Sequence, residues 1–190
     1  TFELYDYIQD AAIRTDYYDR QYAQMLAGWL PRIEDYSLMY RPVIESQLRE
    51  IAGRLDEPQR YDEYLAFARI HSALANGDKG GDFTSASANF QKSIAQNPGL
   101  PATYRLLAGH VGSAGDLAAG QAYLESALER LPALDNPHLN AKHRSLVKNE
   151  NYLIQLAAGD MYAQADDIQL ARAAYDRAAD FRETGYLYSR

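Results

Sequence analysis

The sequence contains no cysteine and no long apolar run, and each absence removes a class of protein. Without cysteine the chain has no disulfide framework, thiolate metal site or cysteine nucleophile, although it fits any cellular compartment. No apolar stretch approaches the roughly 18 residues that a membrane-spanning helix requires. The net charge is -7 and the cations form no basic run, so we expect no nucleic-acid partner.

The chain begins at Thr1 rather than at methionine, and nothing that follows resembles a signal peptide. We therefore expect a processed or trimmed chain, which leaves open an export signal or lipid anchor that was removed. This expectation favours a periplasmic or envelope-associated protein over a cytoplasmic one.

What is present is a globular composition with an unusual number of tyrosines. Of the 190 residues, 47% are hydrophobic and 24% are charged, which is enough for a core and unlike a disordered chain. The 16 tyrosines combine an apolar ring with a polar tip, so they suit half-buried helix faces and binding surfaces alike. The tyrosines of the first 40 residues either pack a helical hairpin or line a groove for a peptide or a glycan. They include Tyr5, Tyr18, Tyr22, Tyr36 and Tyr40.

Two blocks of the sequence match each other at a spacing of 34 residues. The first block is Gly81-Asp82, Ala86, Phe90, Ser93 and Pro98. Its counterparts are Gly115-Asp116, Gly120, Leu124, Ala127 and Pro132. A third copy, without the proline, is Asp166-Asp167, Ala171, Tyr175 and Ala178. Internal repeats of this length indicate stacked helix pairs, because one pair cannot bury its apolar face alone.

These blocks resemble the tetratricopeptide repeat (TPR) family. Its pattern is an aromatic, Leu-Gly, a tyrosine, a Gly-Asp turn, a small residue, an aromatic, an alanine and a proline. The leading positions of the second copy hold Tyr104, Leu107-Ala108 and Val111, and those of the third hold Gln155, Ala158-Gly159 and Tyr162. The resemblance implies an all-α solenoid, a right-handed superhelix of antiparallel helix pairs, with repeats at about 61–98, 101–134 and 137–185.

The small residues of the blocks have a packing rationale. Ala86, Gly120 and Ala171 are expected where the second helix of each repeat approaches the first, because a larger side chain would force the helices apart. Phe90, Leu124 and Tyr175 are expected to fill the space beside them.

The first 60 residues do not fit the repeat. Apolar periodicity predicts a long helix over 2–30 that ends before Pro31, and a second helix with Pro42 in its first turn. The apolar stripe of the second helix is Val43 or Ile44, Leu48, Ile51 and Leu55. We expect residues 1–60 to form a divergent hairpin packed on the array of residues 61–190, in one compact domain.

The array is interrupted before its third copy. Ala171 follows Gly120 by 51 residues, which is 17 more than the 34-residue spacing. Asn136 is a good N-cap and Pro137 a good first helical residue, so we predict one helix of about 27 residues that ends near Ala165. Its first half is expected to project beyond the array or, preferably, to pack on the N-terminal helix.

No constellation of catalytic or metal-binding residues emerges, so the sequence predicts no enzyme active site, no cofactor and no metal. His71 and His110 lie near apolar helix faces, and His138 and His143 are poorly spaced for a shared metal. The glycines around Lys79 lack the order of a phosphate loop. Paired carboxylates such as Asp166-Asp167 lie at helix ends, where capping explains them.

Candidate protein-binding residues follow from the TPR resemblance, which implies a concave face lined by the first helix of each repeat. In the first copy these positions are Arg69, Ser72 and Asn76. In the second they are Arg105, Gly109, Gly112 and Ser113. In the third they are Leu156, Asp160, Ala163 and Gln164. The set is polar and mixed in charge, without the cluster of cations that would clamp a peptide carboxylate.

We therefore expect a non-enzymatic TPR scaffold or adaptor that binds a protein or peptide partner, for example in a bacterial envelope assembly. One alternative is an accessory protein that binds a carbohydrate or small ligand in polysaccharide export or solute uptake. Another is an all-helical enzyme, whose sign would be a deep cleft with facing carboxylates. Self-association through residues 181–190, including Tyr186, Leu187 and Tyr188, is a further expectation.

Overall fold

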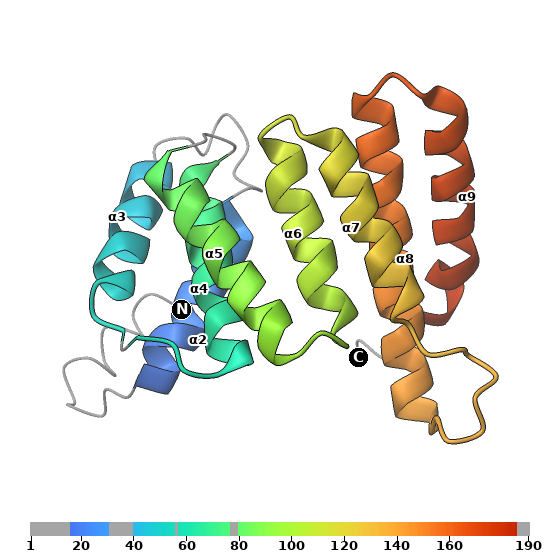
Figure 1. Ribbon diagram of the computed structural model, residues 1–190, viewed down its shortest axis with the longest axis horizontal. Helices are drawn as coiled ribbons and strands as arrows, with labels where there is room; N and C mark the ends of the chain where they lie inside the picture. The colour runs from blue at the N-terminus through green and yellow to red at the C-terminus, as the bar shows by residue number, and fades with distance from the viewer. Residues whose placement is uncertain (1–15, 31–39, 56, 77–79, 186–190) are drawn as a thin grey trace. The chain divides into compact units, whose positions relative to one another are not determined.

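A computed structural model describes residues 16–30, 40–55, 57–76 and 80–185 (Figure 1). These ranges hold eight α-helices and no β-strand, so the predicted all-α class is confirmed. The chain divides into two compact units, Thr1–Gln96 and Asn97–Arg190. The boundary places the first predicted repeat in the same unit as the N-terminal hairpin.

The first unit contains four described helices. They are α2 (Asp16–Trp29), α3 (Arg41–Ala52), α4 (Tyr61–Ala75) and α5 (Gly81–Gln96). Helix α2 packs on α3 and α4, α3 also packs on α4, and α4 packs on α5. Pro42 lies in the first turn of α3, as predicted. Residues 2–15 of the helix predicted over 2–30, and its end at Pro31, lie outside the described residues.

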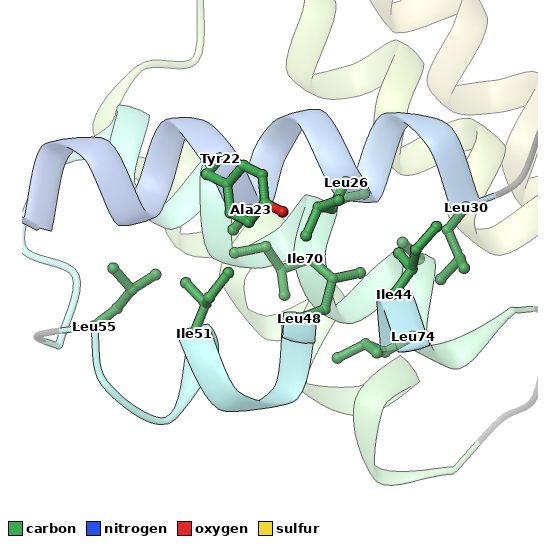
Figure 2. Packing of buried hydrophobic residues seen from close by; sticks show 12 residues of the cluster. Tyr22, Ala23, Leu26, Leu30, Ile44, Leu48, Ile51, Leu55, Ile70 and Leu74 are labelled. Atoms are coloured by element: carbon green, nitrogen blue, oxygen red, sulfur yellow. The ribbon is translucent and has the colours of Figure 1, made fainter. Parts of the chain in front are cut away.

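Large aliphatic side chains form the core of the first unit (Figure 2). Leu26 from α2, Leu48 from α3 and Ile70 from α4 are each fully buried. The ambiguity in the stripe of α3 is settled in favour of Ile44, which is 5% exposed, whereas Val43 is 53% exposed. Burying each such side chain stabilises the fold by roughly 1.5–3 kcal/mol, so these three helices hold together mainly through this cluster.

A carboxylate links the helices of the first unit at one end. Asp82, in the first turn of α5, accepts hydrogen bonds from Arg49 of α3 at 2.8 Å and from Nδ1 of His71 on α4 at 2.9 Å. Burial alone would raise the pKa of Asp82, but the bonds from His71 and Arg49 outweigh it and hold the pKa below its ordinary value. One side chain thus ties three helices together.

The described part of the second unit, residues 97–185, also contains four helices. They are α6 (Pro101–Ser113), α7 (Leu117–Glu129), α8 (Ala141–Gln164) and α9 (Ile168–Gly185). Each helix packs on the next, and α6 also contacts α8.

The turns before α7 and α9 have the same structure. Asp116 caps α7 by accepting a bond from the backbone N–H of Ala119 at 3.1 Å, and Asp167 accepts from Leu170 at 3.0 Å. The preceding residue is left-handed in both turns, with φ of 86° at Gly115 and 64° at Asp166. The Gly-Asp and Asp-Asp motifs therefore encode one geometry: a left-handed residue that ends a helix and a carboxylate that starts the next.

Small residues allow close helix approach in the second unit. A Cβ on Gly120 would lie 2.8 Å from the sulfur of Met161 on α8 and 3.2 Å from the carbonyl oxygen of Ala108 on α6. Ala171 and the predicted filler Leu124 are buried too, and so are Ala86 and Phe90 on α5 of the first unit. The close approach predicted at Gly120 and the burial of the other four residues are confirmed.

The expectation for Tyr175 was wrong. This side chain is 37% exposed, because it covers the edge of the helix pair instead of filling the interior. Its ring lies against Gly159, where a Cβ would come within 2.4 Å of the ring. A glycine on α8 thus receives an aromatic ring from α9.

The predicted single long helix exists as α8, but its predicted start was wrong. Asn140 caps α8 by accepting from the backbone N–H of His143 at 2.9 Å, and the helix has 24 residues. Asn136 instead accepts from the N–H of His138 at 3.0 Å and closes a turn within the loop. The first turns of α8 extend past the ends of α7 and α9 (Figure 1). The packing of this segment on the N-terminal helix stays a prediction.

Candidate functional site

One face of α6 carries three of the predicted binding residues. Arg105, Gly109 and Ser113 are four residues apart, which places them above one another on a helix. Gly109 and Ser113 are exposed, and Arg105 is partly buried. The Ser113 hydroxyl donates to the carbonyl oxygen of His110 at 2.8 Å, so this side chain is held against its own helix.

Arg105 fixes α6 to α8. Its Nε and Nη2 donate to the two carboxylate oxygens of Glu150 at 2.6 Å and 3.3 Å. The two side chains are only 19% and 18% exposed, so water screens this two-point pair less than it would a surface pair. Glu150 was not among the predicted site residues, because sequence spacing alone could not show which residue of the over-long helix would face Arg105.

Contacts at both ends of α6 show that α6 and α8 run in parallel. Arg105 meets Glu150 near the start of α6, and a Cβ on Gly112 would lie 2.9 Å from Cε of Met161 near its end. Gly112 was predicted to be an exposed binding residue, and this was wrong. It is buried because its missing side chain makes room for Met161.

Gly109 differs from the other glycines inside the helices of the second unit. A Cβ on Gly112, Gly120 or Gly159 would meet a side chain of a neighbouring helix at 2.9 Å or less. A Cβ on Gly109 would meet nothing within 4 Å. Glycine in a helix interior is about 1 kcal/mol less favourable than alanine, and packing explains this cost at every one of these positions except Gly109.

The end of α8 carries the remaining predicted residues of this unit. Asp160, Ala163 and Gln164 are exposed, whereas Leu156 is partly buried. Asp160 accepts a hydrogen bond from the Tyr175 hydroxyl at 2.7 Å. This bond is the main reason that the pKa of Tyr175 is raised above its ordinary value. The sequence offered no signal for the pairing beyond the position of Tyr175 in the repeat.

The predicted binding residues of the first unit are tied to the hairpin. The Arg69 guanidinium donates to Oε1 of Gln24 on α2 at 3.1 Å and is partly buried. Asn76 is left-handed, with φ of 47°, and its Oδ1 accepts from Nη2 of Arg41 at 3.2 Å. Ser72 is partly buried and its carbonyl oxygen accepts from the N–H of Asn76. In this unit, α2 and α3 therefore bond to two of the three residues that the sequence assigned to a partner, Arg69 and Asn76.

The described ranges hold neither a metal-binding cluster nor a membrane-spanning helix. Within them, no group of three or more His, Cys, Asp or Glu side chains could hold a metal ion. His71 pairs with Asp82, and His110 is buried at 3% exposure. Across the same part of the chain, every helix is too short or too polar to cross a membrane.

Comparisons with protein-family models, curated proteins and solved structures found no match to this chain.

Proposed function

We propose that this protein is a TPR-like α-solenoid scaffold that binds an extended segment of another protein along α6 and α8. The support for the solenoid is the repeated turn before α7 and α9, together with the small residues that let neighbouring helices approach. In such an array the leading helices of consecutive repeats run in parallel, as α6 and α8 do.

The observation that carries the binding proposal is the open Gly109. It lies on an exposed helix face, and among the described residues no atom lies within 4 Å of the place where a Cβ would be. Glycine is suited to places where another backbone approaches closely. A partner chain lying across α6 at this point accounts for a glycine that internal packing does not.

The charges on this face indicate the kind of partner. Arg105 is the cation on this face of α6, and it is neutralised by Glu150. An unpaired cluster for a peptide carboxylate is therefore missing from this face. The face instead offers the hydroxyl oxygen of Ser113 one turn from the open backbone at Gly109, which suits hydrogen bonding to an uncharged extended segment.

The test is selection of binding peptides from a displayed random library, followed by affinity measurements on three proteins. The first is the native protein, the second Gly109→Gln, and the third the control Ala122→Gln, which makes a similar change at an exposed position of α7. We expect the selected peptides to bind Gly109→Gln at least about tenfold more weakly than the native protein, a loss of about 1.4 kcal/mol or more in binding free energy. The control should bind them with native affinity.

Loss of stability does not account for this result, because glutamine is a better helix former than glycine and a Cβ at this exposed position meets no described neighbour within 4 Å. If the library yields no binding peptide, or if the peptides bind Gly109→Gln as tightly as the native protein, the proposal is wrong.

A further inference from the structure

Charge is divided along α8 and its flanking turns. Between Asn136 and Asn149 the chain has three cations, Lys142, Arg144 and Lys148, and no carboxylate. Between Asn151 and Ala171 it has three carboxylates, Asp160, Asp166 and Asp167, and no cation. The two ends of the second unit's longest helix therefore carry opposite charges.

The basic end is exposed and has an apolar centre. Lys142 and Arg144 are exposed, and neither forms an ion pair with another described residue. Leu146, one turn further along, is 57% exposed. The first turns of α8 extend past the start of α6 (Figure 1), and more than half of the Leu146 side chain is left uncovered by the described residues.

The acidic end of α8 also combines exposed charges with exposed apolar side chains. Asp166 and Asp167 are exposed in the turn between α8 and α9. Two apolar side chains follow them, Ile168 at 65% and Leu170 at 46% exposure. This end thus offers carboxylates and an uncovered apolar surface, as the other end offers cations and a leucine.

One molecule cannot join its own two ends. Helix α8 has 24 residues and is about 36 Å long at 1.5 Å per residue. We propose that the basic end of α8 in one copy of the protein docks on the acidic end of a second copy. The contact would pair Lys142 and Arg144 with Asp166 and Asp167, and would cover Leu146 with Ile168 and Leu170.

Charge complementarity favours a second copy of the protein, over other partners, as the molecule that binds the two ends of α8. A membrane or another anionic surface would satisfy the basic end and leave Ile168 and Leu170 uncovered. A second copy satisfies both ends with surfaces of matched chemistry, and opposite charges also favour this register over one that opposes like charges. The contact does not use Gly109, so it stands apart from the proposed peptide site.

The test is sedimentation velocity of the full chain from micromolar to millimolar concentration at low and high salt. A basic-end variant combines Lys142→Glu with Arg144→Glu. An acidic-end variant combines Asp166→Asn with Gln164→Lys and Gln169→Lys, which spares the cap Asp167. As a control, Gln91→Glu with Lys92→Glu changes exposed residues of α5.

We expect the native protein to associate, and to do so less at high salt. Each end variant should weaken association by at least about tenfold, since like charges then face each other. An equimolar mixture of the two variants should recover it, because the new carboxylates of one meet the new lysines of the other. The basic-end variant should remain folded, since carboxylates suit the first turn of a helix.

A native protein that stays monomeric over the whole range would overturn the proposal. So would association that the control weakens as much as the end variants do, or a mixture of the two variants that fails to recover it. Loss of association in the basic-end variant alone would assign that surface to a different contact and would equally overturn it.

Discussion

The helices of the two units differ in how closely they approach and in what fills the space between them. In the first unit, long aliphatic side chains such as Leu26, Leu48 and Ile70 fill the space between α2, α3 and α4. In the second unit, glycines bring the helices close, and single long side chains such as Met161 and Tyr175 lie in the space that the glycines leave.

The two units should therefore be sensitive to different kinds of substitution. A core of large side chains loses stability when a side chain is shortened and a cavity opens. Helices in close contact lose stability when a side chain is enlarged and must push a neighbour away. Hydrogen exchange measured helix by helix assigns each loss of stability to one unit.

The largest effect is expected from Leu48→Ala in α3. Leu48 is fully buried, so its removal should lower the free energy of unfolding of the first unit by about 3 kcal/mol. Denaturant unfolding measures the loss, and exchange should rise in α2, α3 and α4. Val43→Ala is the matched control, because Val43 is 53% exposed. Similar losses in the two variants would show that the aliphatic cluster does not carry the stability of this unit.

A smaller effect is expected from Gly120→Val in α7. The new side chain would collide with Met161 of α8 and the carbonyl of Ala108 on α6, at a cost of about 1–3 kcal/mol. Met161 is flexible and can absorb part of the collision, but the backbone carbonyl cannot. Ala122→Val, on an exposed position of the same helix, serves as the control. A Gly120→Val protein as stable as this control would contradict close packing in the second unit.

Asp82→Asn should lower the free energy of unfolding of the first unit by about 1 kcal/mol. Because the folded pKa of Asp82 is lowered, its contribution is present above its unfolded pKa and is lost as pH falls through the lower folded pKa. The native protein should therefore lose more stability on acidification than the variant does. Parallel stability curves for the two proteins would show that the bonds to His71 and Arg49 contribute nothing.

The smallest effect is expected at the rim of the second unit. Tyr175→Phe removes the bond to Asp160, which lies on an exposed surface, so stability should fall by about 0.5 kcal/mol. The phenol should titrate at a higher pH in the native protein than in Asp160→Asn, because the bond to Asp160 raises the pKa of Tyr175. Tyrosine ring NMR signals report this titration, and equal midpoints would mean that the bond does not form.

The sequence predicted the features that local chemistry determines. The turn motifs gave the starts of α7 and α9, and Pro42 gave the first turn of α3, because caps and prolines act within a few residues. The small residues of the repeat, such as Gly120, predicted where helices approach. The predicted start of α8 was wrong because asparagine is a suitable N-cap at both Asn136 and Asn140, and the helix begins after the second.

Features that depend on distant partners could not be predicted in this way. Glu150 and Arg105 bond although they lie 45 residues apart in the sequence, and the same separation divides Gln24 from Arg69. Gly112 and Gly109 look alike in sequence, yet Met161 covers only the first. Whether a residue of α6 is a binding residue or a packing residue therefore depends on the register with α8, which no local pattern reveals.

The most direct test of the central claim is a pair of free energies measured for Gly109→Ala. If the open face of α6 receives a partner backbone, alanine should stabilise the fold by up to about 1 kcal/mol and weaken binding of the selected peptides. Opposite signs for unfolding and binding are the predicted result. A variant that is more stable and binds the same peptides with unchanged or higher affinity would contradict the account.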